Sequence, residues 1–175
     1  MTERENVILV DENDCEIGLM EKMEAHVKGV LHRAFSVFVF NNDGDLIIQQ
    51  RAYSKYHSPG IWANTCCSHP RQGEKVIDAA HRRLKEEMGF DTELKEVFSF
   101  LYKADVGQGL IEHELDHVII GVYNESPKIN DQEVASWKAL PVQEIRDLIK
   151  INPEQYAEWF KIAFEQVSLH GEINL

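Results

Sequence analysis

The chain has 175 residues, 43% of them hydrophobic and 27% charged, which predicts one domain with room for a sizeable core. Its formal net charge of −12 argues against nucleic acid or an anionic membrane as the main partner. No apolar run approaches the roughly 20 residues that a membrane-spanning helix needs, and an anionic small molecule stays possible only where local cations or a metal hold it.

The chain has three cysteines, two of them adjacent, and they do not make a disulfide framework. Reduced thiols fit a cytosolic setting better. The first residues are polar and acidic, unlike a signal peptide. We therefore expect a cytoplasmic protein, either a monomer or a weak homodimer, without a nucleic-acid or membrane partner.

Along the chain, short hydrophobic runs alternate with periodic segments, and there is no internal repeat. Aromatic and β-branched runs bounded by turn residues predict strands, at residues 7–10, 34–40, 46–51, 96–103, 115–124 and 134–138. The second and third of these form a predicted hairpin. Helical signals predict helices, at residues 19–26, 76–88, 141–149 and 154–168. Because the order lacks strict βαβ alternation, we expect an α+β sandwich with a mixed sheet.

The helix predicted at residues 76–88 has the clearest local signals. Arg82 and Glu86 are four residues apart, as are Arg83 and Glu87. Such pairs on a solvent-exposed helix face contribute only about 0.3–0.5 kcal/mol each. Taken alone, they indicate an ordinary solvated face. The opposite face is apolar and consists of Ile77, Ala80, Leu84 and Met88.

Imidazoles and carboxylates from distant segments are candidates for one metal site: His26, His32, His69, Glu112 and Glu114. Glu112 and Glu114 lie two residues apart at the entrance of a predicted strand, so their carboxylates share one face while His113 points the other way. A mixed nitrogen and oxygen shell suits Mn²⁺, Mg²⁺ or Zn²⁺. The alternative is that each histidine is an ordinary surface or core residue with a hydrogen-bond partner.

One motif in this region points to different chemistry. The stretch from His113 to His117 matches the zinc-protease pattern H-E-x-x-H. That pattern requires a helix, on which both histidines face one metal. Here it runs into a β-branched segment, and on a strand the two histidines lie roughly 13 Å apart. We therefore expect no protease.

The acidic helix belongs to a longer pattern. Residues 68–89 follow the register of the Nudix box, G-x5-E-x7-R-E-U-x-E-E-x-G-U, where U is a bulky aliphatic residue. The matching positions are Glu74, Arg82, Glu86, Glu87 and Gly89. Ser68 replaces the first glycine, and Arg83 replaces a glutamate that binds catalytic metal in Nudix hydrolases. The second exchange should weaken hydrolysis of a diphosphate while adding a cation that could bind it intact.

Together with other segments, this pattern resembles type I isopentenyl-diphosphate Δ-isomerase, a non-hydrolytic branch of the Nudix superfamily. The likeness covers nearly the whole chain, through residues 21–26, 31–38, 50–55, 59–70 and 111–114. It implies a Nudix-type α/β/α sandwich with a mixed sheet, in a single Nudix-like isomerase domain over residues 1–175. Ser68 departs from the glycine common in this family, which changes loop freedom but no reacting group.

The resemblance implies a 1,3 shift of a double bond that converts isopentenyl diphosphate to dimethylallyl diphosphate in isoprenoid biosynthesis. An unactivated alkene is a very poor base, so a strong, well-placed acid must protonate it. We expect Glu114, assisted by Tyr102, to deliver the proton. Cys67, as thiolate, would then remove one from the opposite face. Cys66 should be a small buried hydrophobe, since only one of two neighbouring side chains on an extended segment can face the pocket.

The same resemblance implies further contacts to substrate and metal. The diphosphate-binding positions are Lys22, Arg51, Lys55 and Arg83. A second ion, Mg²⁺, would bridge Glu87, the Cys67 backbone carbonyl and the diphosphate. Trp159 would face the cationic intermediate, although a role as a core tryptophan explains it equally well.

Two other functions remain open from the sequence. The first is a Nudix hydrolase of a nucleoside diphosphate derivative, and the second is a binding module that keeps the fold without catalysis. A hydrolase has no need of the thiol and acid pair formed by Cys67 and Glu114. These two residues, with Arg83, therefore distinguish the isomerase.

Overall fold

The computed structural model of the chain describes residues 5–55 and 57–169. Strand β3 (His32–Phe40) lies in the middle of its sheet and is almost entirely buried. One edge of β3 pairs in parallel with β8 (Leu110–Val122). The other edge pairs antiparallel with three strands in turn, β1 (Asn6–Val10), β6 (Cys66–Ser68) and β4 (Asp45–Arg51). The sheet is therefore mixed, as predicted.

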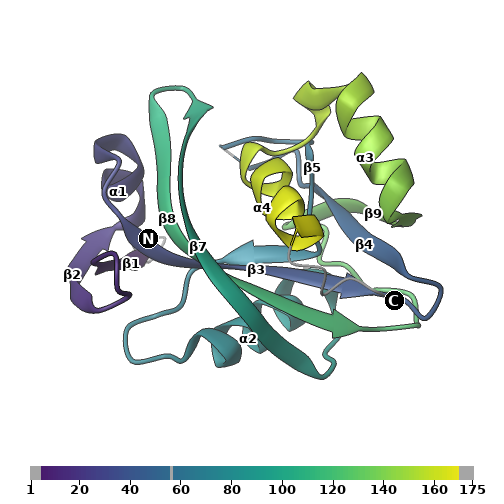
Figure 1. Ribbon diagram of the computed structural model, residues 1–175, viewed down its shortest axis with the longest axis horizontal. Helices are drawn as coiled ribbons and strands as arrows, with labels where there is room; N and C mark the ends of the chain where they lie inside the picture. The colour runs from purple at the N-terminus through teal and green to yellow at the C-terminus, as the bar shows by residue number, and fades with distance from the viewer. Residues whose placement is uncertain (1–4, 56, 170–175) are drawn as a thin grey trace.

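Four further strands extend the sheet outward. β2 (Glu16–Glu21) pairs with β1, while β5 (Trp62–Ala63) and β9 (Val134–Pro141) both pair with β4. β7 (Leu94–Gly107) pairs antiparallel with β8, and this long hairpin crosses the whole molecule (Figure 1). The β7–β8 hairpin thus places residues 94–122 along one edge of β3, and β6 places residues 66–68 along the other.

Helices cover both faces of the sheet. α2 (Val76–Met88) packs on one face, and α3 (Val142–Ile151) and α4 (Glu158–Leu169) lie on the other (Figure 1). Side chains alternate along β3, so Val37 and Val39 join the core under α2 while Phe38 joins the core under α4. The short helix α1 (Lys22–Lys28) lies beside β8 at the N-terminal end of the molecule. No helix in the described ranges is long and apolar enough to cross a membrane.

The predicted α+β sandwich with a mixed sheet is confirmed, and the helix at residues 76–88 matches α2. The helix predicted at 19–26 is wrong in its first part, because residues 16–21 form β2 through pairing with a distant strand. The last predicted helix is divided. A 3₁₀ turn spans Pro153–Gln155, Tyr156 is extended with φ −120° and ψ 136°, and α4 begins only at Glu158.

The predicted hairpin at residues 34–51 forms only near its turn. β3 and β4 pair through Val39 with Ile47 and through Phe40 with Leu46. Below that point β6 takes the edge of β3, opposite Phe35, Ser36 and Val37. This insertion places the two cysteines in the centre of the sheet.

Candidate active site

A cavity of about 200 Å³ opens on the face of the sheet that α4 covers. Its walls come from segments far apart in the sequence, including α1, β4, β6, α2, β8 and α4. The predicted site residues that line it are Lys22, His26, Arg51, Lys55, Cys67, His69, Arg83, Glu87, Glu112, Glu114 and Trp159. The other two, His32 and Tyr102, contact the lining carboxylate of Glu114.

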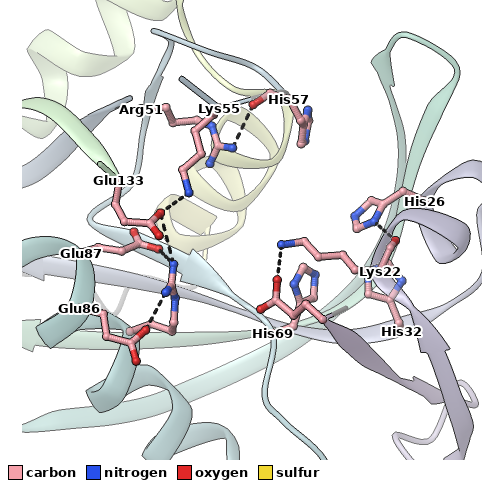
Figure 2. A network of polar contacts seen from close by, with 12 residues as sticks. Lys22, His26, His32, Arg51, Lys55, His57, His69, Glu86, Glu87 and Glu133 are labelled. Atoms are coloured by element: carbon pink, nitrogen blue, oxygen red, sulfur yellow. Dashed lines mark hydrogen bonds and ion pairs between the residues drawn. The ribbon is translucent and has the colours of Figure 1, made fainter. Parts of the chain in front are cut away.

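Three imidazoles and one carboxylate converge at one end of this cavity, and Figure 2 shows the three imidazoles. His26 lies on α1, His32 begins β3, His69 follows β6 and Glu114 lies on β8. One ligand atom from each falls within 4.8 Å of those of the others. The Nε2 atoms of His26, His32 and His69 lie 3.9, 3.3 and 3.1 Å from Glu114 Oε1. Four separate elements therefore assemble this cluster.

The hydrogen bonds around the cluster show that it suits a cation. His26 Nδ1 lies 2.6 Å from the Lys22 carbonyl oxygen, and His32 Nδ1 lies 2.8 Å from the Val30 carbonyl oxygen. A carbonyl only accepts, so each Nδ1 carries a hydrogen, and each ring turns its Nε2 toward the Glu114 carboxylate. Three ring nitrogens and a carboxylate around one point are ligands that suit a divalent metal, with the carbonyls orienting the His26 and His32 rings from behind.

Tyr102 links the two acids of β8. It lies opposite Glu114 on β7, and its hydroxyl is 2.6 Å from Glu114 and 2.9 Å from Glu112. Burial, together with the Glu114 carboxylate, raises the pKa of Glu112 to about 8. Burial acts on Glu114 too, but hydrogen bonds from His32 and His69 hold the pKa of Glu114 well below its usual range.

A tyrosine hydroxyl has one proton, so it can donate to only one of these two carboxyls at a time. With Glu112 neutral and Glu114 ionised, Glu112 donates to Tyr102 and Tyr102 donates to Glu114. The three groups then form a directed proton chain that ends at Glu114. Within the described part of the chain, Glu112 does not join the convergent ligand set, so its place among the metal ligands stays a prediction.

The two adjacent cysteines of β6 face opposite sides of the sheet. Cys66 is completely buried in the core under α2, and Cys67 lines the cavity. Cys67 lies opposite Ser36 on one edge of β3, and Glu114 lies opposite His32 on the other. Burial, aided by the Glu87 carboxylate, raises the pKa of the Cys67 thiol far above its usual range. The thiol therefore keeps its proton until a group in the cavity takes it.

The far end of the cavity brings cations together with carboxylates, in a chain whose net charge is −12. Lys55 pairs with Glu133, which also lies 3.6 Å from Arg83 (Figure 2). Arg83 bonds Glu87 as well, and this buried carboxylate accepts a further 2.8 Å bond from Gln49. Cations and carboxylates thus hold one another in place around the space where a diphosphate could lie. The predicted binding cations are Lys22, Arg51, Lys55 and Arg83.

Backbone carbonyl groups hold Arg51 in place. Its Nε and Nη2 donate to the carbonyl oxygens of Ser58 and His57 at 3.1 and 3.0 Å. Its guanidinium lies 5.2 Å from the centroid of the Trp159 ring. Trp159, on α4, is 5% exposed, and it both lines the cavity and packs in the core. The two roles considered for Trp159 are therefore compatible.

His57 lines the cavity and is a residue that the sequence patterns did not identify. Its Nε2 lies 3.5 Å from Glu112 Oε1, and its ring centroid lies 5.5 Å from that of Trp159. Burial and the neighbouring Arg51 cation lower the pKa of His57 to about 4. The available signal was position alone, because His57 stands between Lys55 and Pro59, in the gap between two segments that carried the family resemblance.

The H-E-x-x-H stretch is a strand, as expected, and forms no metal site. His113 lies on β8 with its Nδ1 3.0 Å from the Gly29 carbonyl oxygen. His117 lies between Glu96 and Asp14, at 2.6 and 3.1 Å. The two rings therefore have different partners.

Comparison with known proteins identifies the family of this chain. The NUDIX domain family matches residues 30–161. An isopentenyl-diphosphate Delta-isomerase of Pectobacterium atrosepticum is 51% identical over 92% of this chain and 90% of its own. Isopentenyl-diphosphate Delta-isomerase 2 of Photorhabdus laumondii is 52% identical over 90% of this chain and 89% of its own. The chain belongs to the isopentenyl-diphosphate Delta-isomerase family, within the Nudix superfamily.

Solved structures agree on the fold. The crystal structure of DR0079 from Deinococcus radiodurans superposes with a TM-score of 0.76 at 18% identity, covering 93% of this chain and 98% of that one. A MutT protein from Methanosarcina mazei gives a TM-score of 0.66 at 13% identity, covering 81% and 96%. At these identities the likeness concerns the Nudix fold alone.

In this isomerase-family chain, the Nudix box has a structural part and a part that faces the cavity. Glu74 accepts 2.7 and 2.8 Å bonds from Arg82 and a 2.8 Å bond from the Arg71 backbone. These contacts fasten the loop before α2 to the helix. Arg83 and Glu87, one turn apart on α2, turn instead toward the cavity.

Proposed function

We propose that this chain isomerises isopentenyl diphosphate to dimethylallyl diphosphate, a step of isoprenoid biosynthesis. The observation that carries the proposal is one small cavity lined by a thiol, Cys67, by the acid Glu114 at the end of a proton chain, and by cations. The names of the closely related proteins support the same reaction. A double-bond shift needs an acid and a base beside one bound substrate.

The proposed steps conserve the substrate's atoms. Glu114, assisted by Tyr102, donates a proton to the terminal carbon of the alkene. This step leaves a tertiary cation. The Cys67 sulfur, as thiolate, then takes a proton from the carbon on the other side, and the double bond forms there. The proton gained by Cys67 returns to Glu114 before the next turnover.

The raised pKa of Cys67 gives this scheme a condition. A thiolate in this cavity is a strong base, so it forms only when the acid pair holds the proton. The cavity therefore works with one proton that moves between the Cys67 sulfur and Glu114, in addition to the proton that neutral Glu112 keeps. Before and after the reaction, the acid and the base are thus in opposite protonation states, and the substrate holds the moving proton while it is a cation.

The metal would be held by His26, His32, His69 and Glu114, with Glu112 as the fifth ligand, and we propose Mn²⁺, Zn²⁺ or Mg²⁺ there. When bound, the ion fixes the Glu114 carboxyl and tunes its acidity. A second ion, Mg²⁺, would be held by Glu87 and the Cys67 carbonyl oxygen against the diphosphate. Lys22, Arg51, Lys55 and Arg83 would bind the remaining phosphate charge.

Trp159 is proposed to face the cationic carbon. A cation over a desolvated indole gains about 2 kcal/mol or more. The cavity also has to exclude water, which would capture the cation as an alcohol. We further propose that residues 1–175 act as a single domain in the cytoplasm, as a monomer or weak homodimer.

The deciding experiment is incubation of the metal-loaded protein with Mg²⁺ and isopentenyl diphosphate, followed by proton and phosphorus NMR. Dimethylallyl diphosphate without released phosphate is the expected result. Phosphate release without the allylic isomer would establish the Nudix hydrolase instead. No conversion at all, with metal bound, would leave a binding module.

A further inference from the structure

The loop between β4 and β5 brings two groups onto one face of the cavity. His57 lies on this loop and Arg51 ends β4, and both line the cavity together with Trp159 of α4. The side chain of His57 is 14% exposed. It is therefore largely buried among groups that the proposed reaction uses.

The Trp159 ring is oriented by packing rather than by a polar contact. Its Nε1 is buried and has no hydrogen-bond partner among residues 5–55 and 57–169. Among the described residues, no hydrogen bond therefore fixes the direction of this N–H. The rings of His57 and Trp159 instead meet at 5.5 Å between centroids and 58° between planes. The Arg51 guanidinium lies 5.2 Å from the same indole.

Arg51 and His57, which both contact the indole, are held by the loop between β4 and β5. Arg51 donates to the backbone carbonyls of His57 and Ser58, as the dashed contact in Figure 2 shows for His57. The His57 ring has polar neighbours at both nitrogens, with Ser58 Oγ 3.0 Å from Nδ1 and Glu112 Oε1 3.5 Å from Nε2. The ring thus spans the space between the acids of β8 and the indole of α4.

We propose that His57 is a positioning residue for the isomerisation, whose ring holds Trp159 against the cavity and keeps water from the tertiary cation. This inference rests on the proposed function and adds to it a residue to which neither the family patterns nor the relatives assign a role. The contact that matters is the ring face against the indole. The Glu112 contact sets the height of that ring in the cavity.

Loss of the ring has a specific chemical consequence. A space beside the indole admits water to the cationic carbon. The water oxygen then bonds to the tertiary carbon and the water proton is released, which yields a 3-hydroxy-3-methylbutyl diphosphate in place of the allylic isomer. A residue that merely stabilises the fold would lower both products together, so the ratio of alcohol to isomer reports on positioning.

The test compares His57→Ala, His57→Gln and His57→Phe in the metal-loaded protein, with isopentenyl diphosphate as the probe and NMR as the readout. His57→Ala should lower kcat by about 10- to 100-fold, since misplacing a reacting group by an ångström has effects of that size. KM should stay within about threefold, because the binding cations remain. The fraction of alcohol should rise. His57→Phe should restore the isomer ratio, and His57→Gln should not.

His81→Ala is the matched control, because His81 lies on α2 and pairs with Asp91 rather than lining the cavity. It should behave as the unmodified chain. Circular dichroism melting and metal content separate folding from positioning, and if His57→Ala does not fold, the Phe and Gln variants decide. Unchanged kcat and product ratio in His57→Ala, or a normal Gln variant beside an impaired Phe variant, overturns the inference. An unmodified chain that makes no dimethylallyl diphosphate refutes the proposed function instead.

Discussion

The two faces of the central strands differ sharply although they share the same backbone. Under α2, the sheet buries an apolar core that includes Val37, Cys66 and Leu84. One residue along each strand, Ser36 and Cys67 line the cavity, together with the buried acids of β8. The alternation of a strand places stabilising and reactive side chains next to each other in the sequence. Adjacent residues can therefore be used as matched experiments on stability and on chemistry.

The two cysteines provide the largest contrast. Cys67→Ala should lower kcat by about 10⁴-fold, the upper range for loss of a positioned base, and Glu114→Gln should have an effect of similar size. Cys66→Ala should keep near-normal kcat and lower the free energy of unfolding by about 1 kcal/mol, as a typical core truncation does. Turnover by NMR and urea unfolding measure the two effects. Near-normal turnover in either Cys67→Ala or Glu114→Gln removes that residue from the mechanism.

The same contrast should appear in stability. Leu84→Ala removes a fully buried side chain under α2 and should lower the free energy of unfolding by about 2–5 kcal/mol. Ser36→Ala removes a 2.8 Å hydrogen bond to buried Asp116 and should lower it by about 1–3 kcal/mol. Urea unfolding of both variants, with kcat measured beside it, is the check. A larger loss for Ser36→Ala would mean that the cavity face contributes more to stability than the apolar core.

The metal cluster offers a third contrast, between histidines of two paired strands. His32→Ala removes an imidazole of the cluster on one side of the β3–β8 pair, whereas His117→Ala removes a β8 ring paired with Glu96. His32→Ala should weaken metal binding by at least about 10- to 100-fold, the effect reported for even the outer partners of a metal site. His117→Ala should leave the affinity within about threefold of the unmodified chain, since it lies outside the cluster. Titration of the chelator-stripped protein with Mn²⁺ or Zn²⁺ decides, and equal affinities would place the metal elsewhere.

Much of this arrangement follows from local sequence. The helix α2 is marked by its apolar spacing and by Gly89, which ends it at φ +70°. Cys67, Glu114 and the metal histidines stand in motifs whose order is specific. What the sequence could not show depends on pairing between distant segments. β2 is a strand because β1 lies beside it, and the contact between His57 and Trp159 exists only after α4 folds over the β4–β5 loop.

Glu112 gives the smallest and most specific contrast, because it concerns one proton. Its pKa in the folded chain is about 8, above its ordinary value, because burial and Glu114 favour the neutral acid. A raised folded-state pKa contributes stability that is complete below the unfolded-state pKa and is lost as the pH rises through about 8.

In metal-free protein, the free energy of unfolding should therefore decline between about pH 5 and pH 8 in proportion to this one group. Glu112→Gln should flatten that decline, since the amide keeps the hydrogen-bonding shape without the titration. Glu93→Gln, at a carboxylate outside the cavity lining, serves as the control and should keep the slope. Thermal melting of the three proteins across that pH range measures it. An unchanged slope in Glu112→Gln would show that the Glu112 carboxyl is already ionised in the fold, and the proton chain through Tyr102 would then have to start from Tyr102 itself.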